Sequence, residues 1–334
     1  MIKSKVLVIG AGPAGTVCAA LLNQAGVDCI LVDRATFPRD KICGGGLTVK
    51  AYRLLSELLP NFRYDYKRIK KIRLLIEKEN ACEFEPADEI RIVKRKDFDN
   101  ALLQEYIQSG GKFEQEAFSK FEIRSDGGIL VTMKSGKQIL CDYLIGADGA
   151  NSSVRRQIVG GCKEKILCLE QYSESMSDAL EVEISRNFDN GYFYVFPNLE
   201  HDVVGFGDRQ TSKEGFRRIL EERGFDITKI KGAYLPVEEV ETGNEHVILI
   251  GDAGGFVNKL SYEGLYYAMV TAKNAFLAIK EGRPFSVTNR QIFKKKRKER
   301  FLARLFYSSF GLWFVKTCTL SPKVVKFIFD YGVR

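Results

Sequence analysis

Three short glycine-rich motifs, far apart in the chain, constrain this sequence more than any other feature. They are GAGPAG at Gly10–Gly15, GADG at Gly146–Gly149 and GDAGG at Gly251–Gly255. Each motif follows an apolar run, and these runs are Lys5–Ile9, Ile139–Ile145 and His246–Ile250. Short apolar runs bounded by glycine are typical of buried parallel strands. We therefore predict an α/β fold in which three separated segments end at one nucleotide site.

The first motif has the spacing of a dinucleotide-binding turn. Gly10 suits the tight turn after the strand, Gly12 lets the backbone approach a pyrophosphate, and Gly15 lets the next helix pack closely. The helix expected at about Ala14–Ala25 directs its first N–H groups at the phosphates. A second apolar strand ends at Asp33, at the distance along the chain that suits a carboxylate on a ribose hydroxyl.

Length and composition narrow the class of protein. A chain of 334 residues exceeds one ordinary hydrophobic core, so two lobes are expected. Much of the net charge of +8 comes from Arg290–Arg300, and no nucleic-acid-binding signature accompanies it. The sequence predicts no transmembrane helix, signal peptide or metal site, because it lacks a long apolar run and its eight cysteines lack metal spacing. We expect a cytoplasmic protein.

The pattern between the motifs predicts a Rossmann-type lobe that is interrupted by a second lobe. From Ile166 to Gly207 successive β segments indicate an antiparallel sheet, which we expect to bind the substrate. The expected boundaries are 1–65, 88–165 and 240–285 for the first lobe, 66–87 and 166–239 for the second, and 286–334 for a C-terminal helical extension.

The second and third motifs each contain a carboxylate. Asp148 is followed by Ser152 and Ser153, either of which suits the N-cap of a helix. Asp252 ends the third strand, where a carboxylate can accept from ribose or ribityl hydroxyls. The alternative role for Asp252 is to cap the following helix.

The three motifs resemble those of FAD-dependent oxidoreductases of the p-hydroxybenzoate-hydroxylase superfamily. Within it, the chain most resembles the geranylgeranyl reductase family. Phe37–Leu47, FPRDKICGGGL, is similar to the family segment P-x-x-K-x-C-G-G-G-L, and Arg95–Asp99 is similar to R-x-x-F-D. Gly191–Pro197, GYFYVFP, is similar to the family's aromatic strand, which lines the substrate cavity. The resemblance covers roughly residues 1–283.

Two departures from the family pattern lie near the expected substrate pocket. Asn258 is followed by Lys259, where the family usually has proline, and the aromatic strand lacks the usual tryptophan. Isoprenoid reduction is therefore a weaker expectation than flavin binding.

The resemblance implies that the chain binds FAD, which is reduced by NAD(P)H or another donor. The residues expected to bind the cofactor lie in or beside the motifs. They are Gly10, Gly12, Pro13, Ala14, Gly15, Asp33, Arg34, Lys41, Cys43, Gly44, Gly45, Arg95, Asp148, Gly149, Asp252, Gly255, Gly264 and Leu265.

The sequence offers few side chains for catalysis. Its two histidines form no recognisable triad or metal site, so the difficult chemistry falls to the cofactor. Cys43 is a gate, a redox thiol or a packing residue. Tyr192 and Tyr194 share one face of a strand and are expected to hold the substrate. The proton for the reaction comes from Tyr192, Tyr262, Glu263 or water, and these alternatives stay open.

The function expected from these features is hydride transfer from reduced FAD to a carbon–carbon double bond of an isoprenoid-like lipid. One alternative is a flavin monooxygenase or halogenase that acts on a small aromatic compound. Another is a non-catalytic FAD-binding module that docks on a membrane or a partner.

The C-terminal segment combines basic and aromatic residues. A basic run at Lys294–Arg300 precedes Phe301, Phe306, Phe310, Trp313 and Phe314. Such a pattern is typical of a segment that lies at a membrane surface, and the alternative is a helical cap on the substrate lobe.

Overall fold

The computed structural model describes residues 2–319 and 321–334. Its first large sheet consists of β1 (Ile2–Ile9), β2 (Cys29–Asp33), β8 (Lys112–Gln115), β9 (Phe118–Ile123), β10 (Ile129–Met133), β11 (Gln138–Gly146) and β17 (Val247–Leu249). The strand order is β8-β2-β1-β11-β10-β9, and β17 also pairs with β11. Strands β8, β2, β1, β11 and β17 run parallel, whereas β9 and β10 are antiparallel additions. The expected Rossmann-type lobe is confirmed.

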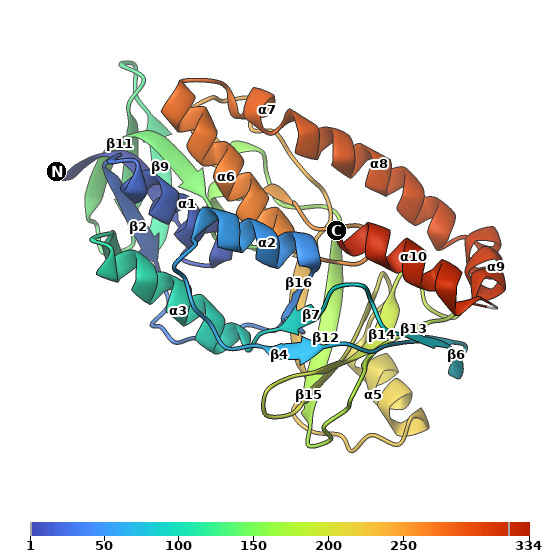
Figure 1. Ribbon diagram of the computed structural model, residues 1–334. Coiled ribbons are helices and arrows are strands. Elements are labelled where there is room, and N and C mark those ends of the chain that lie inside the picture. Colours follow the sequence, from blue (N-terminus) through green and yellow to red (C-terminus); the bar gives the residue numbers. More distant parts are fainter. Residues whose placement is uncertain (1, 320) are drawn as a thin grey trace.

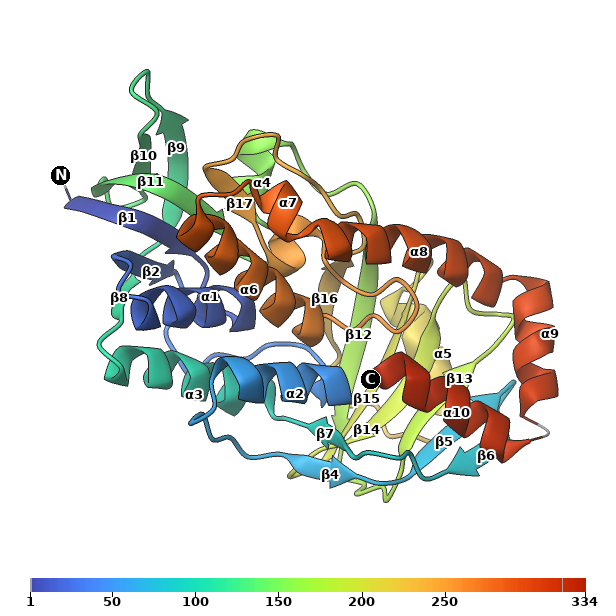
Figure 2. The same cartoon turned by 45° about the horizontal axis from the view of Figure 1, so that its top comes forward.

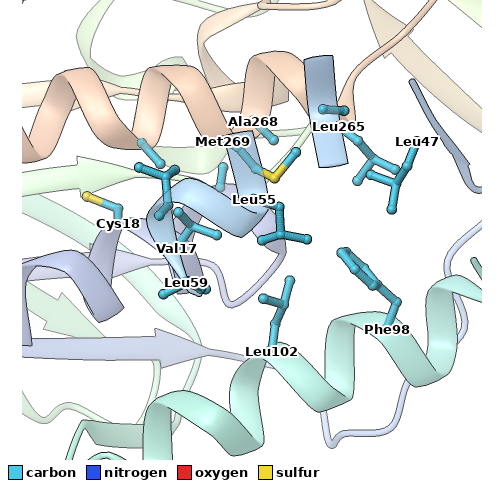
Figure 3. Close-up of a cluster of buried hydrophobic side chains, with 14 of the residues drawn as sticks. Val17, Cys18, Leu47, Leu55, Leu59, Phe98, Leu102, Leu265, Ala268 and Met269 are labelled. Atoms are coloured by element: carbon cyan, nitrogen blue, oxygen red, sulfur yellow. The ribbon is translucent and has the colours of Figure 1, made fainter. Parts of the chain in front are cut away.

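Four helices enclose the main hydrophobic core of this lobe. They are α1 (Pro13–Gln24), α2 (Val49–Leu58), α3 (Arg95–Gln108) and α6 (Leu265–Glu281). Figure 3 shows side chains from these helices meeting in one cluster, among them Val17, Leu55, Leu102 and Met269. Burial of these aliphatic groups draws together segments that are up to 250 positions apart in sequence.

The second large sheet is mostly antiparallel, as expected. Its order is β16 (Lys231–Pro236), β12 (Lys165–Ser173), β15 (Asp202–Asp208), β14 (Tyr192–Pro197), β13 (Leu180–Ile184), β5 (Ile72–Ile76) and β6 (Glu79–Phe84). Only β13 and β5 pair in parallel. Helix α5 (Lys213–Glu222) packs Phe216 and Leu220 against Phe193 and Phe206 on one face. Because side chains alternate along a strand, Tyr192 and Tyr194 lie on the opposite face.

A small sheet lies between the two large ones. It has the order β3 (Gly46–Leu47), β7 (Ile90–Ile92) and β4 (Lys67–Ile69). Strand β3 directly follows the segment Cys43–Gly45, and β7 leads into α3. This sheet therefore fixes the glycine-rich segment before β3 relative to the start of α3.

Helices form the C-terminal part of the chain. These are α7 (Phe285–Thr288), α8 (Arg290–Phe306), α9 (Ser309–Cys318) and α10 (Pro322–Val333). Figures 1 and 2 show α8 running away from α6, α9 at the far end of the molecule, and α10 returning toward α2. Phe329 of α10 packs against Phe84 of β6, with ring centroids 5.4 Å apart. No helix in residues 2–319 and 321–334 has both the length and the apolar character needed to cross a bilayer.

The basic run on α8 is not uniformly solvated. Lys296 is fully buried, and its ammonium forms an ion pair of 2.8 Å with the buried Glu299. Tyr267 and Asn258 also donate hydrogen bonds to Glu299. One lysine of the basic run is therefore buried, because α8 turns Lys296 toward the loop before α6.

Candidate FAD and substrate site

The three glycine motifs meet at the ends of neighbouring strands. A β-carbon on Gly10 would lie 2.4 Å from the carbonyl oxygen of Ala147, in the second motif. A β-carbon on Gly251, in the third motif, would lie 2.9 Å from the β-carbon of Ala14. Gly10 also has a φ of +108°, which disfavours any side chain. One site is thus assembled from segments that begin at Gly10, Gly146 and Gly251, as the sequence predicts.

Within the first motif, the space beside Gly12 is open, whereas the space beside Gly15 is filled by neighbouring backbone. A β-carbon on Gly15 would lie 1.8 Å from the carbonyl oxygen of Gly10, so this glycine is required for helix–strand packing. A β-carbon on Gly12 would meet only the Arg39 guanidinium, at 3.5 Å. Gly12 is the N-cap of α1, and no described side chain caps that helix end. The exposed N–H groups and the open space fit a pyrophosphate.

Two arginines beside this loop share one carboxylate. Arg95 donates two hydrogen bonds of 2.8 Å to Asp99, and Arg39 approaches the same carboxylate at 3.4 Å. The side chain of Asp99 is fully buried. Two guanidinium groups against one carboxylate leave a net positive charge near Gly12, which favours an anionic ligand. The sequence analysis named Arg95 and missed Arg39, although Arg39 lies within the recognised FPRDKICGGGL segment.

Asp33 lies where the dinucleotide motif predicts it, at the end of β2. Its carboxylate accepts hydrogen bonds from the backbone N–H groups of Ala11, at 2.7 Å, and Ala35, at 2.8 Å. These bonds hold the first glycine loop against the end of β2. The neighbouring Arg34 is exposed to solvent. Contact of Asp33 or Arg34 with a ribose stays a prediction.

The other two aspartates have different surroundings. Asp148 accepts a hydrogen bond of 2.6 Å from the N–H of Ser153, at the start of α4 (Ser153–Ile158). Burial raises the pKa of this carboxyl group. Ser152 is the N-cap and accepts from the N–H of Arg155 at 2.8 Å, as the sequence predicts. A β-carbon on Gly264, the N-cap of α6, would lie 3.5 Å from a carboxylate oxygen of Asp252. Asp252 thus lies beside a second helix N-terminus.

The segment from Cys43 to Gly46 passes between the two lobes. Gly45 has a φ of +78°, and a β-carbon there would lie 2.0 Å from the carbonyl oxygen of Val93. A β-carbon on Gly44 would lie 2.6 Å from the Phe196 ring and 3.3 Å from the Tyr194 ring. The backbone of this segment is therefore held against the aromatic face of β14. Lys41 and Cys43 precede it and are half-buried.

The hydroxyl groups of two candidate tyrosines are bonded to backbone carbonyl groups. Tyr192 donates to the carbonyl oxygen of Ser261 at 2.6 Å, and Tyr262 donates to that of Asn190. The two rings stack with centroids 5.6 Å apart. This arrangement connects β14 with the loop before α6.

Glu263 has a different set of partners. Its carboxylate accepts from the hydroxyl of Thr48 and pairs with the Lys50 ammonium at 3.1 Å. The structure therefore gives Glu263 the role of joining the α6 N-terminus to the start of α2.

One buried acid was missed in the sequence. Glu170 of β12 is only 6% exposed, and its carboxyl group accepts a hydrogen bond of 2.5 Å from the Tyr194 hydroxyl. Burial raises the pKa of Glu170 to about 7, although the hydrogen bond from Tyr194 acts in the opposite direction. The available signal was a carboxylate directly after the apolar run Ile166–Leu169.

Comparisons with known proteins agree with this site. The FAD binding domain family matches residues 3–167. Menaquinone reductase of Mycobacterium tuberculosis is 29% identical over 86% of this chain and 83% of its own length. The chloroplastic geranylgeranyl diphosphate reductase of Arabidopsis thaliana is 28% identical over 84% of this chain and 66% of its own length. The crystal structure of a geranylgeranyl bacteriochlorophyll reductase-like protein from Thermoplasma acidophilum has a TM-score of 0.74, at 18% identity, over 100% of this chain and 91% of the other.

The fold and the site define an FAD-dependent oxidoreductase. Within that class, the chain is similar to geranylgeranyl reductases, at 28% identity to the enzyme of Arabidopsis thaliana and 27% to that of Synechocystis.

Proposed function

We propose that this protein reduces carbon–carbon double bonds in the polyprenyl chain of a lipid. The observation that carries the proposal is the contact of the Cys43–Gly46 segment with the aromatic face of β14. Gly44 lies against Tyr194 and Phe196, so a flat cofactor ring beside this glycine would have an apolar, aromatic wall opposite it. Such a wall suits a hydrocarbon chain better than a polar substrate.

FAD supplies a hydride when it is bound and reduced. The residues of this chain position it. The α1 N-terminus with Gly12 and Arg39 would hold the pyrophosphate, and the segment around Gly44 would hold the ring system. Tyr192 and Tyr194 hold the alkene on the opposite side and exclude water. NAD(P)H is the proposed source of electrons for the flavin.

An anaerobic single-turnover experiment tests the reaction. Holoenzyme is reduced with NADPH or, in a parallel sample, with dithionite, and then mixed with geranylgeranyl diphosphate. We expect flavin reoxidation that depends on the prenyl compound, and a product that gains two hydrogens for each double bond reduced. Geranylgeraniol without the diphosphate is the matched control for recognition of the head group. Hydroxylation or halogenation of an aromatic compound in air, without alkene reduction, would replace the proposal by the monooxygenase alternative.

We further propose that the far end of the molecule contacts an anionic membrane. Helices α8, α9 and α10 expose an apolar end surface, which Figures 1 and 2 place away from the first sheet. Its members are Phe301, Phe310, Trp313, Phe314, Phe327 and Tyr331, all at least half exposed. Arg304, Lys316 and Lys323 are exposed on the same three helices. Aromatic groups with flanking cations suit the boundary between lipid head groups and acyl chains.

A pocket beside α9 supports delivery of a lipid from this surface. It has a volume of about 290 Å³ and is lined by Ile76, Ile184, Leu312 and Lys316, among others. Ile184 pairs with Ile76, and it lies two residues beyond Val182, which pairs with Tyr194. The two isoleucines therefore share the sheet face of Tyr194. A prenyl chain that enters under α9 would follow that face toward the proposed flavin site.

Vesicle co-sedimentation tests the membrane proposal. We expect wild-type protein to bind vesicles that contain phosphatidylglycerol, less so at high salt because surface charges are screened. Phe310→Ala with Trp313→Ala should weaken binding by roughly tenfold or more, since both rings lose apolar contact area. Ile123→Ala with Met176→Ala removes exposed apolar side chains elsewhere and is the matched control. Equal binding by both double variants would leave the end surface without this role.

A further inference from the structure

A row of residues across the second sheet places Glu170 and Tyr194 in contact although their strands are not neighbours. Glu170 of β12 pairs with Gly205 of β15, and Gly205 also pairs with Tyr194 of β14. Paired residues point to the same face of a sheet, so the three positions form one row. A side chain at the middle position would separate the outer two.

Gly205 has no side chain, and this allows Tyr194 and Glu170 to come into contact. A β-carbon there would lie 2.2 Å from Cζ of Tyr194 and 2.3 Å from its hydroxyl oxygen. The tyrosine ring thus lies across the glycine and reaches the carboxyl group of Glu170, with 2.5 Å between the two oxygens. The side chains are almost completely enclosed, since Glu170 is 6% and Tyr194 8% exposed. By contrast, the carboxylate of Glu263 is paired with the Lys50 ammonium.

The pair faces the proposed flavin-binding segment. The ring of Tyr194 contacts the position of Gly44, which follows Cys43. The ionisable groups that face the pair come from three sides of the pocket. They are Lys41 and Cys43 before β3, Arg95 of α3, Cys168 of β12 and Tyr192 of β14. On the neighbouring β16, Lys231 pairs with Glu170 in register, and its ammonium lies 3.2 Å from the carboxylate of Asp40.

We propose that Glu170, positioned by Tyr194 across Gly205, donates the proton that completes reduction of the double bond. The inference rests on the proposed function. The hydride from reduced flavin forms one C–H bond and leaves the flavin oxidised. The O–H bond of Glu170 breaks, its proton forms the second C–H bond, and the alkene π bond is lost. Tyr194 then donates its hydrogen bond to the resulting carboxylate, which stabilises the charge.

The spent carboxylate also has a route to solvent. A small pocket of about 10 Å³, roughly the space that one water occupies, is lined by Glu170 together with Lys41, Tyr172 and Lys231. Lys229 and Asp40 complete its outer side. A water in this pocket returns a proton to Glu170 after each turnover, without opening the substrate side.

Three holoenzyme variants test the inference. Glu170→Gln keeps the size of the side chain and removes the proton, Glu170→Asp shortens the acid, and Tyr194→Phe removes only the hydrogen bond. Glu181→Gln on β13 is the matched control, because its carboxylate pairs with the partly exposed Arg73. With NADPH or dithionite as reductant, all variants should retain FAD and reduce it at the wild-type rate.

The expected loss is confined to the alkene step. Glu170→Gln should slow single-turnover reduction of geranylgeranyl diphosphate by roughly 10²- to 10⁴-fold, the usual contribution of a general acid. The wild-type rate should fall as pH rises through about 7, where Glu170 ionises, and the residual rate of the variant should not. Tyr194→Phe should move this profile toward higher pH, because the carboxylate loses its stabilising donor.

Two readouts are independent of turnover. Infrared spectra of oxidised holoenzyme should show a protonated carboxyl band that disappears with a midpoint near pH 7 and is absent from Glu170→Gln. The raised pKa also means that the folded protein prefers the protonated acid. The stabilisation that protonated Glu170 gives the folded protein is complete below the ordinary glutamate pKa and is lost as pH rises through about 7. Over that interval, the melting temperature of Glu170→Gln should therefore rise relative to that of wild type.

The outcomes separate this inference from the proposed function. If wild-type enzyme reduces the prenyl compound and Glu170→Gln does so at a similar rate at pH 6, Glu170 is not the proton donor. A carboxyl band that does not titrate between pH 5 and 8 overturns the inference as well. If wild type binds and reduces FAD but never reduces a prenyl alkene, the proposed function fails, and the proton transfer assigned here fails with it.

Discussion

Glycine serves opposite purposes in the two halves of the site. In the first lobe, Gly10 and Gly15 bring one stretch of backbone against another, and Gly12 leaves room for a ligand. In the second lobe, Gly205 leaves room for a side chain of the same protein, the ring of Tyr194. The first arrangement lies within six consecutive residues, whereas the second combines three strands. A cofactor-binding loop can therefore be recognised in the sequence as a motif, whereas a row of residues across three strands cannot.

The largest expected effect separates packing from ligand binding within the first motif. Gly15→Ala places a β-carbon 1.8 Å from the Gly10 carbonyl oxygen, so α1 must move away from β1. We expect the free energy of unfolding to fall by roughly 3 kcal/mol or more. Gly12→Ala has open space and a backbone conformation that alanine accepts, so its stability should stay within about 1 kcal/mol of wild type.

In Gly12→Ala, the loss of FAD affinity should be larger than its small loss of stability suggests. Gly12→Ala should fold normally and bind FAD weakly, because the methyl group occupies the space proposed for the pyrophosphate. Urea unfolding measures the stability of the apoproteins, and titration with FAD, followed by flavin fluorescence, measures the affinity. Equal losses of stability in both variants would show that the open space at Gly12 does not distinguish a ligand position from a packing position.

An intermediate effect is expected in the second lobe. Gly205→Ala forces the Tyr194 ring away from Glu170, at a cost of roughly 1–3 kcal/mol in the free energy of unfolding. FAD affinity should remain near wild type, since the phosphate loop lies in the other lobe. Gly161→Ala, in an open loop position, is the matched control. If Gly205→Ala lost FAD affinity without losing stability, Gly205 would serve ligand binding rather than the packing of Tyr194.

Sequence reasoning succeeded where the determinants are local. The turn at Gly10, the carboxylate at Asp33 and the N-cap at Ser152 each depend on residues close in the chain, and the structure has each of them at the expected position. The aromatic face of β14 was also predicted, because alternation along a strand is local.

What sequence reasoning missed depends on pairing between distant segments. Glu170 reaches Tyr194 only because β15 lies between their strands and has glycine at the shared row. Likewise, Lys296 looked like one member of a solvated basic run, and its burial depends on Tyr267 and Asn258 beyond α8. No spacing along the chain encodes either neighbour. The available signal for Glu170 was its position directly after the apolar run Ile166–Leu169.

The smallest expected effect concerns the second motif, which resembles the first but has a different local structure. Here Ser152 caps α4 and the N–H of Ser153 donates to Asp148. Ser152→Ala should lower the free energy of unfolding by about 1 kcal/mol, the usual cost of losing an N-cap. Ser153→Ala keeps the backbone N–H that Asp148 uses and is the matched control. Urea unfolding and FAD titration measure the two consequences. If Ser152→Ala weakens FAD binding more than tenfold at unchanged stability, the second motif serves the ligand as directly as the first. If only stability falls, its carboxylate acts on the cofactor through the helix that it holds in place.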